Sequence, residues 1–492
     1  MGVRNGQQFI DGLKANPREV WINGERIEDV TTHPAFSRIV RQLARLYDAQ
    51  VDPATRDTLT YEVPETGQRA GMAFMPAKTA EDLRRRRDAF YHWASMNFGL
   101  MGRSPDFLNV SLLAFAEARE VFGRGGQRYA DNIVNYYEYV RDNDLFLSHA
   151  LITPQNDRTK SSAEQKNLHM RVVKETDSGI YVQGARMVAT LGAVADEMLM
   201  YCLPGIPESD ADHALSFAVK VSDPGVRQIC REPYTLDGQR SDFDHPLSNN
   251  FEENDSLLIF DNVFVPWERV FMYRDVALNN ALYTETALRN YTAHQTNTRA
   301  LVKMQFAVGV AMAVARSIGA DKFLHVQRML GEALNGVVPQ ERSGAFGGGM
   351  RAHVIRHRAA RAAAASGASH LPSDSLSEGG GNHPDRGCRR VHDDALGRGF
   401  HCARTFRGHQ PLLQGCRRDV FARPGTAVQA RLGSFRRGVR HPAASVRALL
   451  CRRPGSDHRF ELPPGAGRRD DAAGERGAGA GRRSRARTQA SF

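Results

Sequence analysis

Cysteine is scarce in this sequence: there are six in 492 residues, and no two stand in a CxxC spacing. That scarcity argues against a disulfide framework and against a zinc ribbon. Long apolar runs are lacking too, since no stretch reaches the roughly eighteen apolar residues of a membrane-spanning helix. The N-terminal run MGVRNGQQFIDGLKANPREV has no apolar segment after a basic start. We therefore expect a cytoplasmic protein with reduced thiols.

Several short motifs of nucleotide and metal chemistry are absent as well. The sequence contains no GxGxxG fingerprint, no P-loop, no HExxH pair and no EF-hand loop. A nucleotide would therefore be held by scattered donors rather than by one Gly-rich turn. Apolar content, in contrast, is high: 41% of the residues are hydrophobic, which in a chain of this length predicts a large core and two or three domains.

Lysine, tyrosine and tryptophan disappear towards the C-terminal end. The last of each are Lys322, Tyr291 and Trp267, whereas arginine, alanine and glycine are abundant from about residue 336 onwards. The net charge of +11 lies almost wholly in this last part. Because it shows neither helical nor strand periodicity, the charge cannot be assigned to a folded surface.

Three interpretations of residues 336–492 compete. A disordered Arg-rich arm could bind nucleic acid, because arginine neutralises phosphates, but such arms usually mix lysine with arginine. A folded domain would have few branched apolar residues to bury. A GC-rich gene read in a shifted frame gives arginine, alanine, glycine and proline with almost no lysine, isoleucine or tyrosine. The composition favours this third interpretation, in which the charge carries no information about function.

The remainder of the chain divides into three blocks. Residues 1–143 are mainly helical, with amphipathic spacing in THPAFSRIVRQLARLYDAQ, for which Thr32 is the candidate N-cap. Residues 144–275 turn to strands, in MRVVKETDSGIYVQG, HALSFAVKV and SLLIFDNVFVP, the last ended by Pro266. Residues 276–335 return to helix. A ligand can bind where such blocks meet.

Four polar residues interrupt apolar surroundings, and none is diagnostic alone. His149 lies at the junction of the first two blocks, where a histidine is more often a satisfied core residue than a catalyst. Arg103, in GRSPDF, could simply cap a helix or pair with Asp106. Thr190 fits an ordinary turn after a strand, and His294 fits the solvated face of an amphipathic helix.

Six stretches, taken together and in order, resemble one family. They are THPAF, GRSPDFLN, DLFLSHALITPQNDR, RVVKETDSGIYVQGARMVATLGAVADE, DHPLSNNFEENDSLLIFDNVFVPWERVF and AHQTNTRALVKMQFAVGVA. Their content and spacing are similar to those of the 4-hydroxyphenylacetate 3-monooxygenase oxygenase family, the large components of two-component, FADH2-dependent aromatic hydroxylases. The resemblance covers about residues 1–335 and stops where the composition changes.

The resemblance implies an acyl-CoA dehydrogenase-like fold: an N-terminal α-helical domain, a central β-barrel and a C-terminal helical bundle, usually in a homotetramer. It implies FAD, used as FADH2, with O2 as co-substrate and a separate NAD(P)H-flavin reductase as partner. The reaction implied is ortho-hydroxylation of a phenol to a catechol by a C4a-hydroperoxyflavin. Because the tail replaces most of the last bundle, we expect the chain as written to be weakly stable with little activity, and a frame-corrected chain to be active.

The resemblance also assigns roles to residues. Arg103 and His149 correspond to the pair around the phenolic oxygen, and His294 to a histidine that acts as base in chlorophenol and nitrophenol relatives. The implied flavin contacts are His149, Ala150, Leu151, Gln155, Asn156, Asp157, Arg158 and Thr190. A guanidinium suits the first role because it keeps its charge and stabilises a phenolate, the form that activates the ortho carbon.

Two departures from the family put the substrate in question. Many relatives carry a tyrosine four residues after the arginine, where this chain has Phe107 and so lacks a hydrogen bond worth roughly 0.5–1.5 kcal/mol. Cys202 and Leu203 stand where 4-hydroxyphenylacetate enzymes place groups that bind the carboxylate. A chlorophenol or nitrophenol monooxygenase is therefore the alternative within the family.

Two further alternatives come from other classes. The related 4-hydroxybutyryl-CoA dehydratase shares the fold but holds an iron-sulfur cluster through cysteines. This chain has none before Cys202 and none between Cys230 and Cys388, which disfavours that function. The other alternative is a non-catalytic protein, either an inactive remnant or a basic protein that binds nucleic acid through its tail.

Overall fold

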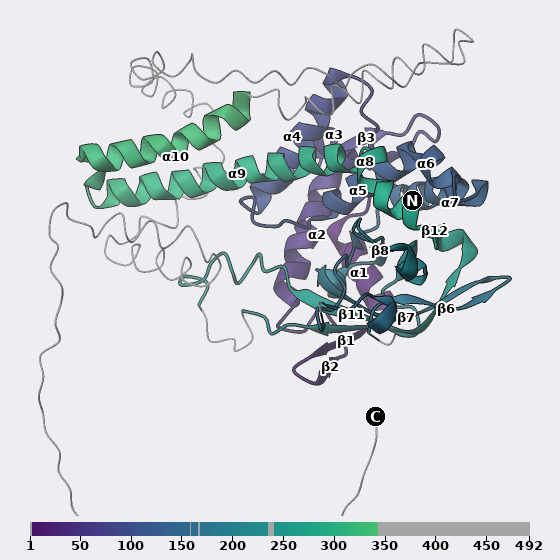
Figure 1. The fold of residues 1–492 in the computed structure, drawn as a ribbon. Coiled ribbons are helices and arrows are strands. Elements are labelled where there is room, and N and C mark those ends of the chain that lie inside the picture. Colours follow the sequence, from purple (N-terminus) through teal and green to yellow (C-terminus); the bar gives the residue numbers. More distant parts are fainter. Residues whose placement is uncertain (1, 158, 166–167, 235–240, 343–492) are drawn as a thin grey trace, which may run out of the picture. The chain divides into compact units, whose positions relative to one another are not determined.

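The computed structural model describes residues 2–157, 159–165, 168–234 and 241–342 (Figure 1). All of these belong to one compact unit. Nearly all of the tail, residues 336–492, lies outside the described residues. Its three interpretations, and the expected loss of stability and activity, therefore stay predictions.

The first part of the chain is dominated by helices, as the apolar spacing predicts. The helices are α1 (Gly6–Ala15), α2 (Ser37–Val51), α3 (Arg56–Leu59), α4 (Ala80–Met96), α5 (Pro105–Glu117), α6 (Arg119–Gly123) and α7 (Gln127–Asn143). In α2 the apolar positions Ile39, Val40, Leu43 and Leu46 are all buried. Helix α5 is buried over eleven of its thirteen residues, so it forms the centre of this block.

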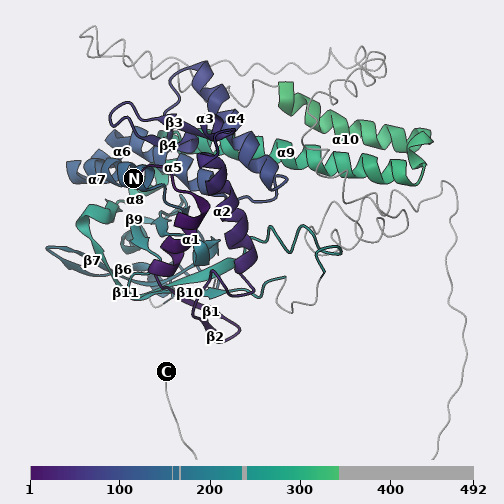
Figure 2. The same ribbon diagram turned by 180° about the vertical axis from the view of Figure 1, so that it is seen from behind.

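The strands form two larger sheets and one hairpin among the described residues. They are β1 (Glu19–Ile22), β2 (Glu25–Ile27), β3 (Thr60–Glu62), β4 (Arg69–Gly71), β5 (Leu147–Ser148), β6 (Arg171–Thr176), β7 (Gly179–Thr190), β8 (Glu197–Met200), β9 (Leu215–Lys220), β10 (Val226–Cys230), β11 (Asp255–Pro266) and β12 (Val270–Tyr273). The six-stranded sheet has the order β2-β1-β10-β11-β7-β6 (Figure 2). The four-stranded sheet has the order β12-β9-β8-β5. Phe217 of β9 and Phe260 of β11 meet edge to face, so the two sheets share a core.

The last described part is again helical, with α8 (Val276–Glu285), α9 (Leu288–Ser317) and α10 (Leu324–Arg342). Helices α9 and α10 run side by side (Figures 1 and 2). Helix α9 packs against α4 and α5. Helices, then sheets, then helices is the order that the sequence predicts; the block boundaries stay predictions.

One local prediction is wrong. Thr32 does not cap α2: its hydroxyl donates to the Asp29 carbonyl oxygen, and the helix begins at Ser37 after an uncapped Phe36. The Asp29 side chain binds Thr31, so residues 29–32 form a turn of their own. The mainly helical first block also contributes β1 to the six-stranded sheet, where it pairs in parallel with β10, about two hundred residues later.

Candidate active site

The loop between α4 and α5 carries Arg103 and is fixed by a buried acid. The Glu253 carboxylate accepts the backbone N–H groups of Gly102 (2.7 Å) and Arg103 (2.6 Å). Burial raises the pKa of Glu253, while these two N–H groups and the charges of Arg103 and Arg299 oppose that shift. The Arg103 backbone is therefore held independently of its side chain.

Helix α9 holds the same loop from the other side. Arg299 donates a hydrogen bond to the Gly99 carbonyl oxygen (2.9 Å). Gly99 adopts φ +68°, and a Cβ there would lie 2.5 Å from the Lys303 backbone nitrogen. Only glycine fits this conformation and this approach without strain. The start of α5 is thus anchored to α9 by a backbone contact.

The Arg103 guanidinium lies over the ring of its neighbour Phe107. Its Cζ is 4.1 Å from the ring centroid, a distance at which a cation is attracted to an aromatic face. Arg103 does not pair with Asp106, which accepts hydrogen bonds from Ser104 and Gln295 instead. The Nε of Arg103 is buried and has no hydrogen-bond partner among the described residues. The guanidinium therefore keeps donors for a ligand.

His149 completes a stack with these two residues. It follows β5 directly, is buried, and its ring lies 5.8 Å from that of Phe107 in an edge-to-face arrangement. Burial, and secondarily the charge of Arg103, lower the pKa of His149 to about 3. The structure thus brings together Arg103, Phe107 and His149, and it keeps the imidazole neutral at physiological pH.

Tyr201, which follows β8, is a member of this cluster that the sequence did not single out. Its hydroxyl oxygen lies 3.2 Å from His149 Nδ1, and its side chain is buried. The residue stands at the end of the run EMLMY, which indicates only a buried strand. The missing information was the pairing of β8 with β5, which no local pattern contains.

Cys202 and Leu203, the predicted contacts of the substrate's acid group, have different surroundings from those of Tyr201. The Cys202 sulfur accepts a hydrogen bond from Arg186 (3.0 Å) and donates to the His213 carbonyl oxygen (3.2 Å). The Leu203 side chain is 43% exposed. No contact of either with Arg103 or His149 is found within the described residues.

The predicted flavin contacts fall on the segment after β5 and at the end of β7. Ala150 is buried, Leu151 and Asp157 are half-buried, Gln155 and Asn156 are exposed, and Arg158 lies outside the described residues. Thr190 donates its hydroxyl proton to Asp255 (2.6 Å), which leaves the oxygen's lone pairs as acceptors.

These residues fit a flavin. Neutral amides and a hydroxyl suit the carbonyl and N–H edge of the isoalloxazine ring. Arg186 donates to the Leu151 carbonyl oxygen, and its buried Nε has no partner among the described residues. A buried cation with an unused donor beside the segment is compatible with an anionic cofactor.

His294, on α9, belongs to a different set of neighbours. Its ring packs edge to face on Phe90, and its Nδ1 has no hydrogen-bond partner among the described residues. Burial, with the charges of Arg86 and Arg87, lowers its pKa to about 3. The pKa of His149 is lowered by the charge of Arg103 instead, so the two histidines have different cationic neighbours. The catalytic role of His294 stays a prediction.

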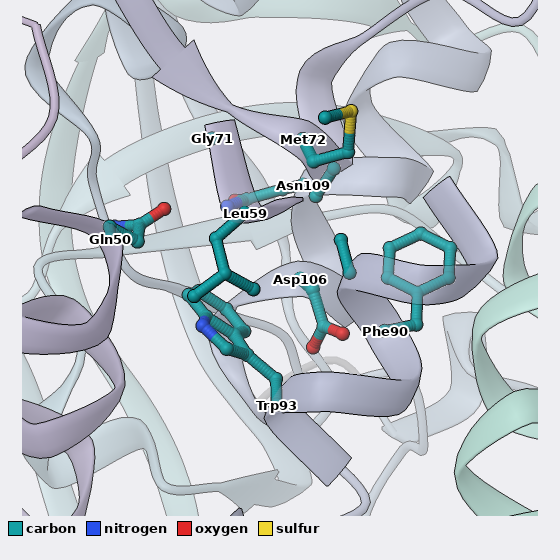
Figure 3. A pocket seen from close by; sticks show the side chains of 10 residues that line it. Gln50, Leu59, Gly71, Met72, Phe90, Trp93, Asp106 and Asn109 are labelled. Carbon is teal, nitrogen blue, oxygen red and sulfur yellow. The ribbon is translucent and has the colours of Figure 1, made fainter. Parts of the chain in front are cut away.

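A small cavity lies beside α5, away from this stack. Figure 3 shows Asp106 of α5 facing Phe90 and Trp93 of α4 across it. The buried Trp93 Nε1 and Asn109 Oδ1 have no hydrogen-bond partner within the described part of the chain. Positions 106 and 109 share one helical face, and Phe107 points about 100° away from the first and about 160° away from the second, so the cavity and the stack use different faces of α5.

Comparison with known proteins shows that nearly all of the described region matches the two parts of one protein family. Residues 5–272 match the family described as 4-hydroxyphenylacetate 3-hydroxylase N terminal, and residues 279–336 match its C-terminal counterpart. The oxygenase component of 4-hydroxyphenylacetate 3-monooxygenase from Thermus thermophilus is 45% identical over 334 residues, 68% of each chain. The oxygenase component of 4-nitrophenol 2-monooxygenase from a Rhodococcus species is 34% identical over 67% of this chain and 63% of that protein.

Solved structures agree with these sequence relatives. The oxygenase component of a 4-hydroxyphenylacetate 3-monooxygenase, complexed with FAD and 4-hydroxyphenylacetate, superposes with a TM-score of 0.65 at 44% identity, covering 69% of this chain and 70% of that one. A 4-hydroxybutyryl-CoA dehydratase from N. maritimus, at 22% identity and a TM-score of 0.60, covers 68% of this chain and 66% of that one, and shares the fold alone. The acyl-CoA dehydrogenase-like fold expected from the sequence is confirmed.

Proposed function

The chain belongs to the 4-hydroxyphenylacetate 3-hydroxylase family, oxygenase components of two-component flavin-dependent monooxygenases, and we propose that Arg103, Phe107 and His149 form its phenol site. The reaction is the ortho-hydroxylation of a phenol to a catechol. When bound, reduced FAD supplies the electrophilic oxygen from O2. The chain's own residues bind the phenol, favour its anion and exclude water.

Stabilisation of the phenolate falls to Arg103. A phenol has a pKa of about 10, so lowering it by two units requires a preference for the anion of about 2.7 kcal/mol. One partly buried cation within about 4–6 Å can supply this. The free Nε of Arg103 supports the assignment, because the half-buried guanidinium has a buried donor unused by the described residues. This observation carries the proposal.

His149 accepts or shares a hydrogen bond at the same oxygen. Its lowered pKa makes the imidazolium unfavourable. A neutral imidazole has one N–H and one lone pair, so it can orient the phenol in either protonation state. The rings of Phe107 and Tyr201 on either side of it keep water from the reacting carbon.

The substrate is a phenol whose para substituent stays open. With Phe107 in place of a tyrosine, the phenolate rests on Arg103 and His149. Because Cys202 is turned to Arg186, a carboxylate-binding role for it is not favoured by its contacts. The relative that acts on 4-nitrophenol supports the same alternative for this chain. We therefore propose 4-hydroxyphenylacetate and 4-nitrophenol as the two substrates to compare.

An NAD(P)H-flavin reductase is the expected partner, since oxygenase components of this class receive reduced flavin from a second protein. We also propose a homotetramer and a cytoplasmic location. Among the described residues, only helix α9 is long and apolar enough to span a membrane. Its most apolar 18-residue stretch has a mean hydropathy of 1.3, and 22% of that stretch is buried. Its Gln295 hydrogen-bonds to the buried Asp106, which supports a packed helix.

The experiment is a coupled assay with a flavin reductase, NADH and each phenol, in which catechol formation is measured. We expect Arg103→Met to abolish catechol formation. The exposed Arg84, paired only with Glu81 on the helix surface, gives the matched control Arg84→Met, which should behave as the parent. The chain as written and a frame-corrected chain are assayed together, and catechol production by Arg103→Met at the parent rate would refute the assignment.

A further inference from the structure

We propose that Tyr201 is a positioning residue for His149: its hydroxyl donates to Nδ1 and thereby holds the imidazole with its proton on Nε2, towards the phenol oxygen. The inference rests on the proposed function, because it concerns the same site. It adds a hydroxyl-bearing residue to a stack in which Phe107 has none.

The fold places the two residues side by side through strand pairing. Strands β5 and β8 run in parallel, with Leu147 opposite Glu197 and Ser148 opposite Met198. His149 and Tyr201 come directly after these strands, and carboxyl ends of parallel strands meet at one sheet edge. The imidazole and the phenol ring have centroids 5.7 Å apart, with the hydroxyl oxygen 3.2 Å from Nδ1.

The rest of Tyr201 is fixed by its packing. Its ring meets Phe115 of α5 edge to face at 5.3 Å and Tyr283 of α8 at 6.4 Å. Phe107, Ser111 and Phe115 are spaced four residues apart, so they share one face of α5. The face that carries Phe107 therefore also supports Tyr201, and a buried ring held on two sides keeps its hydroxyl oxygen beside His149 Nδ1.

The protonation states decide the direction of the hydrogen bond. Burial raises the pKa of Tyr201 well above 10, so the phenol keeps its proton, and the lowered pKa of His149 keeps the imidazole neutral. The Tyr201 hydroxyl also hydrogen-bonds with Tyr283 and Ser111, so its single proton has two candidate acceptors, His149 Nδ1 and the Tyr283 oxygen. For the contact with His149 two arrangements follow. Donation from Tyr201 leaves a proton on Nε2, whereas donation from Nδ1 would leave Nε2 with a lone pair.

The developing phenolate selects between these arrangements. An Nε2–H donor stabilises an anionic oxygen, whereas a lone pair facing it would repel it. Arg103 already favours the anion, so the tautomer with Nε2–H acts in the same direction. The tyrosine hydroxyl thus acts on the substrate through the histidine, which adds a hydrogen bond to the one that Arg103 offers and that Phe107 cannot offer.

The test is the ionisation of a bound phenol, measured without turnover. 4-Nitrophenol is the probe, because its anion absorbs in the visible and its pKa lies near neutrality. The full chain is titrated with the probe over a range of pH. We expect Tyr201→Phe to reduce the ionisation constant of bound 4-nitrophenol by about two- to tenfold, the loss of one hydrogen bond.

Two variants separate positioning from a structural effect. In a His149→Gln background, Tyr201→Phe should change the ionisation constant no further, since its effect passes through the imidazole. Tyr61→Phe is the matched control: Tyr61 is also buried and donates to a carbonyl, that of Phe74, so its loss should leave the bound probe unchanged. An equal effect of Tyr201→Phe with and without His149 would overturn the proposal.

A measurement on the parent chain covers a variant that fails to fold. Histidine labelled with 15N reports which ring nitrogen carries the proton, and the His149 resonances are those lost in His149→Gln. We expect the Nε2–H form, and an Nδ1–H form would overturn the proposal. If the parent chain leaves 4-nitrophenol un-ionised below the pKa of the free probe, the proposed function fails; if it ionises the probe but Tyr201→Phe has no effect, only the inference fails.

Discussion

Acidification should destabilise the described fold through its two buried histidines. His149 and His294 have pKa values of about 3 in the folded chain, against 6.5 as the unperturbed value. At pH values between these two pKa values, the histidines bind protons in the unfolded state but not in the folded state. Their contribution to the free energy of unfolding is therefore complete above pH 6.5. It decreases as the pH falls from there towards 3, by about 1 kcal/mol per pH unit for each histidine.

The buried acids act in the opposite direction. Burial raises the pKa values of Asp106 and Glu253, so they favour the folded state at low pH and weaken it as the pH rises. A plain pH profile would mix both effects. The difference between the parent and His294→Asn isolates one histidine, because the acids are common to both chains.

The assay is urea unfolding at about pH 7.5 and about pH 5.5. The parent should lose about 1 kcal/mol more stability between these conditions than His294→Asn does. His325→Asn, at an exposed position, should follow the parent. If His294→Asn and the parent lose the same stability, His294 is protonated in the folded chain, and the argument from its burial is wrong.

Two further substitutions test the loop and the stack. Phe107→Tyr should strengthen binding of a phenol by about two- to tenfold through one added hydrogen bond, measured as the dissociation constant; unchanged affinity and preference between 4-hydroxyphenylacetate and 4-nitrophenol would show that Phe107 does not set the substrate. Gly99→Ala should destabilise the fold by about 2 kcal/mol or more, because its Cβ would meet Arg299 and Lys303 of α9 at positive φ. Gly24→Ala shares the positive φ but meets no neighbouring atom, so it should cost clearly less, and equal losses would refute the clash.

Much of the architecture follows from patterns within single elements. Apolar spacing locates α2, and alternation around a turn locates β6 and β7, because each pattern reflects one buried face. Strand β9, buried at five of its six positions, is indicated by its β-rich composition instead. Pro266 ends β11 where expected. The prediction of Thr32 as the N-cap of α2 is wrong because the carboxylate of Asp29 hydrogen-bonds to Thr31, which makes a separate turn before the helix. The pattern alone cannot rank such competing partners.

The site was only partly predictable, for a different reason. Arg103, Phe107 and His149 were selected by resemblance, and the structure brings them into contact. Tyr201 and Glu253 were not found, since each reaches the stack through pairing or packing between distant segments. Nothing in the strand containing Tyr201 indicates that its neighbour is β5, fifty residues earlier. Non-local parallel pairing leaves no trace in local periodicity.

The alternation of side chains after β8 also matters for engineering. Tyr201 faces His149, whereas the next residue, Cys202, is bonded to Arg186 and to the His213 carbonyl. Two consecutive residues therefore have separate sets of neighbours. A library at position 201 would change the surroundings of His149 in the proposed phenol site, and one at 202 would change the contacts of Arg186, which donates to the Leu151 carbonyl in the segment proposed to contact flavin. Selections for new phenols can vary the first position while the second is kept constant.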